Sequence, residues 1–458
     1  MAEATVIGPV HGGSRGRPFG RPLVDLERYG FVEEEWFLEG DATRYRSDGP
    51  LGPDGRWSAT PAGTARFRTR FVVYRPATAD AFNGTVVVSW NNVSAGYDLF
   101  GGESPEILEG GYAFVGVTTQ RVAIEGLPPS PQGLAAWDPE RYGSLSHPGD
   151  DYSYDIFTAA ARTLGPGRSR SAVDPMGGLE VRHLIAMGMS QSAGRLATYV
   201  NAIHPLTSAF DAYLLGIWFG AGTPLEVGDE VVDLNKINAE QDGGAAGLLR
   251  GTHRLRDDLD VPVMVVNSEL EAIPCRWLDL PDTDRFRYWE VAGASHVSVQ
   301  SMAIRGPKYE RDFGTRLPVL QGMNAVPLQP VYDAALHHLH RWVDGGPPPP
   351  AQPRIEFAGN PPGIVRDTDG IAKGGVRLPY VEVPLGRNSM EPLGDDLFSL
   401  LYGSSRPFPA EQVAARYGDR STFLARYTEA ARAAEQTGVL LPRDVDALVE
   451  EAAANYPG

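Results

Sequence analysis

The sequence is poor in cysteine and has no long apolar run. Among its 458 residues only Cys275 is a cysteine, which excludes an intrachain disulfide and any metal site built from several cysteines. No stretch approaches the roughly 18 consecutive apolar residues that a membrane span requires. The opening MAEATVIGPVHGGSRGRP has no apolar segment behind a basic one, so no secretory signal is expected. These absences predict a soluble, cytoplasmic protein that makes no membrane contact.

Positive charge is also scarce. Lysine supplies only three of the 41 basic residues, and 58 acidic residues give a net charge of −17. Binding to nucleic acid requires a basic face that neutralises phosphates, so nucleic acid is not an expected partner. The hydrophobic share of 42% and the charged share of 22% are those of a globular protein with a large core.

Six segments are continuous apolar runs of the kind found in strands buried on both faces. They are GTVVVSW (84–90), YAFVGVTT (112–119), HLIAMGM (183–189), DAYLLGIW (211–218), VPVMVVNS (261–268) and FRYWEV (286–291). Helical patterns occur at 153–164, 192–203 and 331–343. This alternation predicts an α/β fold, in which helices cover both faces of a mostly parallel sheet. Segments 31–46 and 65–75 alternate apolar and polar residues, which predicts antiparallel strands at the N-terminal edge of that sheet.

Two segments depart from this alternation and indicate how the chain is divided. Residues 219–258 are rich in glycine and then charged, and an excursion of that length between two strands predicts a lid or binding loop. Four consecutive prolines from Pro347 predict a stiff connector. We therefore expect a core over residues 1–345 and a C-terminal extension over 346–458, helical from about Ala410, that packs on the core.

The sharpest local signal is GMSQSAG at residues 188–194, which follows a buried strand and opens an amphipathic helix. This is the strand–turn–helix context of a nucleophile elbow, whose tight turn exposes a serine, here Ser190. Gly188 stands two residues before it, and Ser192 replaces the second glycine of the G-x-S-x-G pattern. The alternative is a turn in which Ser190 or Ser192 merely caps the following helix.

A nucleophilic serine needs a base, and the sequence offers nine histidines. Only His296 lies in a loop directly after a late buried strand, where its side chain can lie over the carboxyl edge of the sheet. The loop residue His147 is the rival candidate. Four other histidines fall in predicted helices or strands and are expected to be structural: His183, His337, His338 and His340.

The base in turn needs a carboxylate that fixes its tautomer. Glu269 and Glu271 both follow the strand VPVMVVNS and precede His296. Nucleophile, acid and histidine then occur in the chain order of α/β-hydrolases, which differs from that of two other well-known serine-hydrolase folds. On the strand context alone, both glutamates are candidates for the acid.

Here the sequence resembles the α/β-hydrolase superfamily over roughly residues 65–345. More narrowly, it resembles over nearly the whole chain a serine-esterase-like group known as alpha/beta hydrolase domain proteins. The matching segments are SWNNVSAGYD, GMSQSAGR, SELE, DTDRFRYWEVAGASH and the late RDTDG…GGVRLP stretch. The resemblance implies an α/β-hydrolase fold. Superfamily spacing places the acid about nine residues after the proline that opens the strand, which from Pro262 favours Glu271 over Glu269.

Acyl transfer also needs hydrogen-bond donors for the oxyanion. In this fold one donor is the backbone N–H of the residue after the nucleophile, here Gln191. The second is expected from the loop at 90–93, through the Asn91 backbone or the side chain of Asn91 or Asn92; the alternative is an Asn-rich turn without function. Arg195 is expected to form a structural salt bridge, with an acidic group of the substrate as the alternative partner.

Together these residues predict a serine hydrolase that cleaves small-molecule carboxylic esters through an acyl-enzyme. A thioesterase, lactonase or acyltransferase would use the same residues, and a binding protein of this fold would leave the serine idle. No cofactor or metal is expected. Asp367-Thr368-Asp369-Gly370 resembles the start of a calcium loop, but the closing Glu is missing, so a turn is expected there.

Overall fold

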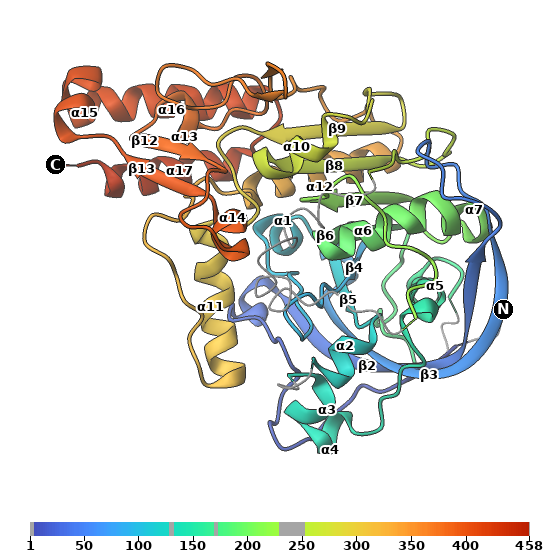
Figure 1. Ribbon diagram of the computed structural model, residues 1–458. Helices are drawn as coiled ribbons and strands as arrows, with labels where there is room; N and C mark the ends of the chain where they lie inside the picture. Colours follow the sequence, from blue (N-terminus) through green and yellow to red (C-terminus); the bar gives the residue numbers. More distant parts are fainter. Residues whose placement is uncertain (1–3, 128–131, 169–172, 229–251, 458) are drawn as a thin grey trace.

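The computed structural model describes residues 4–127, 132–168, 173–228 and 252–457, and a nine-stranded β-sheet forms their centre (Figure 1). The strand order is β1-β2-β3-β5-β4-β6-β7-β8-β9. The strands are β1 Thr5–Ile7, β2 Phe31–Ser47, β3 Ala59–Pro76, β4 Thr85–Trp90, β5 Ala113–Val117, β6 His183–Met189, β7 Ala212–Gly216, β8 Val263–Ser268 and β9 Phe286–Val291. Each continuous apolar run in the sequence therefore contains one strand.

The strand directions divide the sheet into two parts. From β5 to β9 all neighbouring strands are parallel, whereas β1, β2 and β3 pair antiparallel with one another and β3 pairs antiparallel with β5. The long hairpin of β2 and β3 comes from the two amphipathic segments, since one face of such a strand can remain in water. The predicted fold class, a mostly parallel sheet with an antiparallel N-terminal edge, is confirmed.

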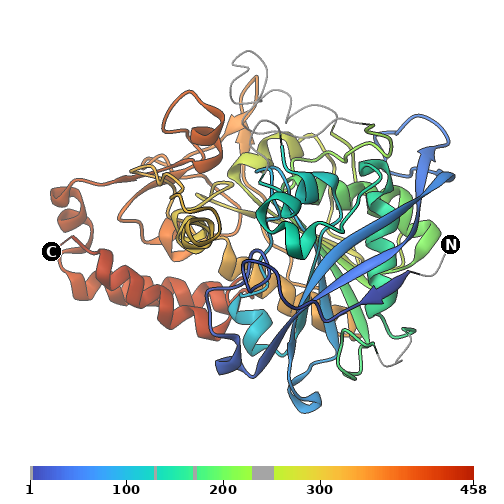
Figure 2. The same ribbon diagram turned by 90° about the horizontal axis from the view of Figure 1, so that it is seen from below.

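Both faces of the parallel part are buried. Along β4, Val87 packs into one hydrophobic cluster while Val86 and Val88 pack into another, because successive side chains of a strand point to opposite faces. Helix α12 covers the first face, and α5 and α6 cover the second (Figures 1 and 2). The helices before the connector are α1 Pro105–Glu109, α2 Arg121–Glu125, α3 Leu134–Trp137, α4 Pro139–Tyr142, α5 Ser153–Leu164, α6 Gln191–Thr198, α7 His204–Thr207, α10 Glu269–Cys275, α11 Val299–Phe313 and α12 Gln329–Val343.

The chain after the prolines returns to the sheet. The Trp289 indole of β9 donates to the Pro350 carbonyl at 2.9 Å, and Val376 forms a parallel bridge to Val291 at the end of β9. Farther on, Phe423 and Leu448 belong to the same hydrophobic cluster as α12. This part contains β10 Phe357–Ala358, β11 Gly363–Ile364, β12 Gly386–Ser389, β13 Ser404–Pro407, α13 Pro379–Glu382, α14 Leu397–Tyr402, α15 Ala410–Tyr417, α16 Arg420–Gln436 and α17 Pro442–Asn455.

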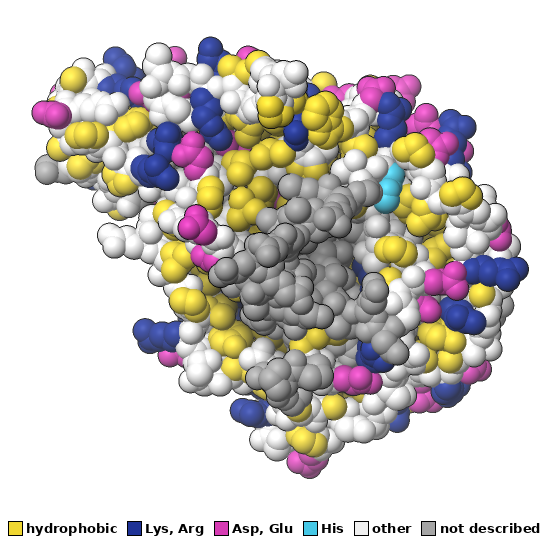
Figure 3. Space-filling model, viewed as in Figure 1, with side chains coloured by type: hydrophobic (Ala, Val, Ile, Leu, Met, Phe, Trp, Pro, Cys, Tyr) yellow, Lys and Arg dark blue, Asp and Glu magenta, His cyan; other side chains and the backbone are white. Residues whose placement is uncertain are grey.

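Much of the predicted lid falls on residues 229–251, which lie outside the described residues. Helix α11 was not predicted, since it contains Gly306 and Pro307 and buries only Met302 and Asp312. Within the described residues, no helix combines the length and the hydropathy that crossing a membrane would require. On the face shown in Figure 3, side chains of both charge signs surround hydrophobic ones.

Candidate active site

Ser190 lies in a sharp turn between β6 and α6, at the carboxyl edge of the parallel strands. Its φ of 58° and ψ of −119° place a non-glycine residue in strained backbone, as a nucleophile elbow does. The Ser190 N–H donates to the Gly216 carbonyl at 2.9 Å, and the Ser190 carbonyl accepts from the Gly194 N–H at 3.1 Å. Neighbouring backbone from β7 and α6 therefore holds the turn.

Glycines in the turn and in the neighbouring strand β7 allow the chain to pack closely here. A Cβ added to Gly188 would lie 2.7 Å from the Ser192 carbonyl oxygen, and one added to Gly216 would lie 2.0 Å from Met189 Sδ. Ser192 stands in place of the second glycine of the motif, and its hydroxyl accepts from the Met189 N–H and donates to the Met189 carbonyl, both at 2.9 Å. The serine thus stabilises the turn.

The helix-capping alternative does not fit this geometry. Although Ser190 stands at the N-cap position of α6, its side chain makes no capping hydrogen bond. The Ser192 hydroxyl bonds to Met189, on the strand side of the turn. The partly exposed Ser190 hydroxyl is therefore not used to hold the helix.

His296 and Glu271 form a buried pair beside this edge. Nδ1 of His296 lies 2.7 Å from Oε1 of Glu271, and the other carboxylate oxygen accepts from the Ser268 N–H at 3.0 Å and the Ser268 hydroxyl at 2.5 Å. Because a carboxylate only accepts, this contact requires a proton on Nδ1 of His296. Glu271 occupies the first turn of α10, where the helix dipole favours an anion.

Glu269 lies elsewhere, although only one residue separates it from Glu271. Its Oε1 accepts from the Gly293 N–H at 2.7 Å, and its Oε2 accepts from Arg366 at 3.0 Å and from the Met390 N–H at 3.2 Å. Burial raises the pKa of Glu269, and the Arg366 guanidinium opposes that shift. Of the two predicted carboxylates, the structure therefore places Glu271 against His296.

Both ring nitrogens of His147, the rival candidate for the base, already form hydrogen bonds to the backbone. Its Nδ1 accepts from the Gly149 N–H at 3.2 Å, so its Nε2 carries the proton and donates to the Thr119 carbonyl at 2.9 Å. Burial lowers its pKa. The histidines of α12 have structural partners, as expected. His337 contacts Glu106, His338 contacts the Gly438 carbonyl, and His340 contacts Thr85.

Among the described residues, Ser190 and His296 make no direct hydrogen bond. They follow β6 and β9, two parallel strands that end at the same edge of the sheet with β7 and β8 between them. Catalytic hydrogen bonds are often long in ligand-free enzymes and shorten when substrate binds. The sheet thus brings the hydroxyl and the His296–Glu271 pair to one edge.

In the loop after β4, the backbone N–H groups of both asparagines and the side chain of Asn92 already donate hydrogen bonds. The Asn91 N–H donates to the Val117 carbonyl at 3.3 Å and the Asn92 N–H donates to the Leu99 carbonyl at 2.9 Å. The Asn92 side chain donates to the Met189 carbonyl at 2.9 Å and so ties this loop to the elbow. The fully buried Asn91 side chain has no hydrogen-bond partner within the described part of the chain, and it lies against Gly116 of β5, on the side of β4 away from Ser190.

A comparison with protein families identifies the family of the chain. The model of a family described as "Alpha/beta hydrolase domain" matches residues 6–450. The chain belongs to this family.

Solved structures add distant likenesses to this alpha/beta hydrolase. Esterase B from Lactobacillus rhamnosis is 14% identical, with a TM-score of 0.29 over 67% of this chain and 88% of that one. Brefeldin A esterase, a bacterial homologue of human hormone sensitive lipase, is 14% identical, with a TM-score of 0.24 over 52% of this chain and 63% of that one. Prolyl oligopeptidase B from Galerina marginata is 12% identical, with a TM-score of 0.25 over 51% of this chain and 34% of that one. No curated protein sequence matches the chain.

Beside the elbow, this hydrolase contains a buried polar network. The Gln191 side chain donates to Gln120 at 3.0 Å, Gln120 donates to Asp150 at 2.9 Å, and Arg195 donates to Asp150 at 2.9 Å. Arg195 therefore forms a structural salt bridge.

The described residues contain no group of three or more His, Cys, Asp or Glu arranged to hold a metal ion. Residues 367–370 form a turn in which the Gly370 N–H donates to the Asp367 carbonyl.

Phe219 is a site residue that the sequence pattern did not identify. Its ring stacks on the His296 ring, with centroids 5.3 Å apart and planes 27° from parallel. Its position directly after the apolar run 211–218, at the carboxyl edge of the sheet, was the available signal. A second missed signal was the spacing of Ser268 and Glu271, which is that of a capping box and would have distinguished the two glutamates.

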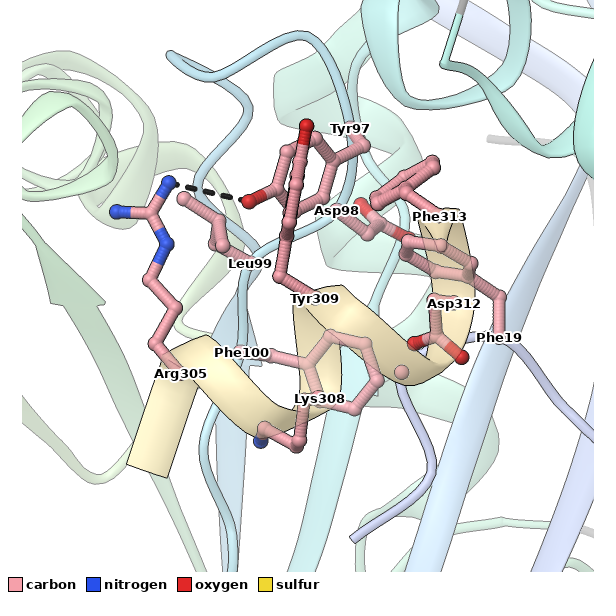
Figure 4. A pocket seen from close by; sticks show the side chains of 11 residues that line it. Phe19, Tyr97, Asp98, Leu99, Phe100, Arg305, Lys308, Tyr309, Asp312 and Phe313 are labelled. Atoms are coloured by element: carbon pink, nitrogen blue, oxygen red, sulfur yellow. Dashed lines mark hydrogen bonds between the residues drawn. The ribbon is translucent and has the colours of Figure 1, made fainter. Parts of the chain in front are cut away.

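A small hollow of about 30 Å³ lies between α11 and the loop after β4 (Figure 4). It is lined by Phe19, Gly20, Tyr97, Asp98, Leu99, Phe100, Arg305, Lys308, Tyr309, Asp312 and Phe313. Across it Arg305 donates to the Tyr97 hydroxyl at 3.1 Å. It has room for only one or two waters, and neither Ser190 nor His296 lines it.

Proposed function

We propose that this alpha/beta hydrolase cleaves small-molecule carboxylic esters, with Ser190 as nucleophile, His296 as base and Glu271 as the acid. Ser190 Oγ bonds to the ester carbonyl carbon while His296 Nε2 takes its proton. The tetrahedral intermediate then expels the alcohol, which takes that proton from His296. Water repeats the attack on the acyl-enzyme and releases the acid, so the cycle is complete without a cofactor.

The observation that carries this proposal is the strained turn of Ser190. Its positive φ costs about 1–3 kcal/mol, and such strain is typical of sites where geometry serves function. The hydroxyl makes no capping bond that would give the strain a structural purpose. The His296–Glu271 pair supplies the tautomer that a base for Ser190 requires.

For the oxyanion we propose the backbone N–H groups of Gln191 and Val93. Gln191 is the first residue of α6, so its N–H has no acceptor within the helix. The Asn91 and Asn92 N–H groups donate to other carbonyls, whereas the next one along the loop, that of Val93, has no hydrogen bond among the described residues. Val93 therefore takes the place first assigned to the two asparagines.

A series of p-nitrophenyl esters of increasing acyl length, extended to lactones and thioesters, tests the reaction class. We expect hydrolysis of at least one ester, and loss of activity by a factor on the order of 10⁶ in Ser190→Ala, because a triad fails as a unit. A thioesterase or lactonase would instead prefer those substrates. Retention of more than about a tenth of the wild-type kcat by folded Ser190→Ala would exclude the proposed nucleophile.

A further inference from the structure

The loop that carries His296 is held from outside the sheet, by the C-terminal extension. On one side of His296, the Ser295 hydroxyl donates to the Tyr402 carbonyl at 2.9 Å. On the other side, the Val297 N–H donates to the Leu401 carbonyl at 3.0 Å. Both carbonyls belong to α14, which reaches from the extension to the top of α11 (Figure 1). The residues flanking His296 are therefore fixed by a segment about a hundred positions later in the chain.

Glu269 extends this contact to the start of the loop. One of its oxygens accepts from the Gly293 N–H, and the other accepts from the Arg366 guanidinium and the Met390 N–H. The Glu269 side chain is fully buried and that of Arg366 is 20% exposed. A buried carboxylate thus joins the histidine loop to two separate parts of the extension, and Arg366 is the cation that balances its charge.

Close packing accompanies these hydrogen bonds. Leu270, between the two glutamates, packs with Leu397 and Leu401 of α14. A Cβ added to Gly403 would lie 2.7 Å from Ser295 Cβ, and one added to Gly293 would lie 2.4 Å from a Val381 methyl group. The extension and the histidine loop are therefore closely packed against each other.

We infer that the C-terminal extension positions His296 for catalysis, and that Arg366 is a positioning residue that acts through Glu269 and Gly293. The inference rests on the proposed role of His296 as base. Removing the guanidinium would leave Glu269 buried without a charged partner, which is costly and is relieved by movement of the loop. A displacement of about 1 Å at a reacting group can lower the rate by about 10²-fold.

The matched pair of variants is Arg366→Met and Arg443→Met. Arg443 also belongs to the extension and pairs with a buried core carboxylate, Glu106, but it joins α17 to α1 and not to the histidine loop. Both substitutions should lower the unfolding temperature. Only Arg366→Met should lower kcat, by about ten- to a hundredfold, with KM within about threefold of wild type.

Two further variants and one spectroscopic signal keep the test decisive if Arg366→Met does not fold. Arg366→Lys should restore part of the lost kcat, and Glu269→Gln with Arg366→Met should be no worse than Glu269→Gln alone, since no unpaired charge remains. The downfield proton signal of His296 Nδ1–H should move in the Arg366 variants and stay unchanged in Arg443→Met.

Unchanged kcat and an unchanged His296 signal in the Arg366 variants would overturn the inference. Equal losses of kcat in Arg366→Met and Arg443→Met would do the same, because the effect would then be one of general stability. Failure of the proposed function is distinct: it would appear as full activity in Ser190→Ala, while the His296 signal would still report whether Arg366 positions the ring.

Discussion

The nucleophile elbow and the histidine loop are built in opposite ways. Every backbone contact that holds Ser190 comes from within the segment 188–216, on the adjacent β6, α6 and β7. The loop at 293–297 is instead held by Glu269, by Asn324, and by residues of the extension between 366 and 402. The turn at Ser190 is thus held by neighbouring elements of the core, whereas the histidine loop also depends on residues about a hundred positions later in the chain.

The largest expected effect lies in the histidine loop itself. His296→Ala should lower ester hydrolysis nearly as much as Ser190→Ala, by a factor on the order of 10⁶. His147→Ala, which removes a buried ring bonded only to backbone, should affect stability more than kcat. Steady-state kinetics on one ester measure both losses of kcat. A large loss in His147→Ala with a small loss in His296→Ala would assign the role of base to His147.

The second largest loss of activity is expected from substitution of one of the two glutamates. Glu271→Gln lets His296 adopt the wrong tautomer, so we expect a loss of about 10⁴ in kcat at neutral pH. Glu269→Gln should change kcat about tenfold or less while lowering the unfolding temperature, because Glu269 holds the loop from behind.

Severe and equal losses in both glutamate variants would show that the two carboxylates act as a coupled pair. The reverse order would transfer the role of acid to Glu269. If neither substitution mattered, His296 would have no acidic partner from this strand and the mechanism would fail.

One glycine in each region allows a methyl group to be added beside closely packed atoms, and at Gly403 the φ of +55° adds backbone strain. Gly188→Ala puts a methyl group 2.7 Å from the Ser192 carbonyl, and Gly403→Ala puts one 2.7 Å from Ser295 Cβ. Each should destabilise the fold by about 1–3 kcal/mol. Gly306→Ala, in α11 with nothing within 4 Å of the added carbon, should be neutral or stabilising. Urea unfolding of the three variants measures this, and equal stabilities would contradict the packing described above.

The last prediction concerns a buried carboxyl group on α12 and the pH dependence of stability, with no change expected in kcat. Burial raises the pKa of Asp333 on α12 to about 7, with Asp444 of the extension and Glu106 nearby. The folded state therefore holds a proton that the unfolded state releases above about pH 4. Stability is lost as the pH rises from about 4 to about 7, by up to about 1.4 kcal/mol per pH unit.

Asp333→Asn should flatten that dependence and leave kcat unchanged, because the Asp333 contacts lie away from the histidine loop. Unfolding in urea at a series of pH values measures the slope. An identical slope in the variant and the wild type would show that Asp333 does not hold the proton.

The sequence was sufficient for features that depend on neighbouring residues. The apolar runs predicted the parallel strands, and the GMSQSAG segment predicted the turn at Ser190 with its small neighbours. It could not show that Arg366 and Met390 meet Glu269, because no pattern relates residues about a hundred positions apart. For a similar reason it could not show that the Asn91 N–H donates to Val117 of β5, because the fold sets that acceptor.

Covalent labelling with a fluorophosphonate, followed by mass spectrometry of the modified peptide, tests the central claim most directly. We expect one adduct, on Ser190, that forms rapidly in the wild type and slowly in His296→Ala, because the base activates the hydroxyl. We expect no adduct in Ser190→Ala. Labelling of a different residue, or the same labelling rate with and without His296, would contradict the claim.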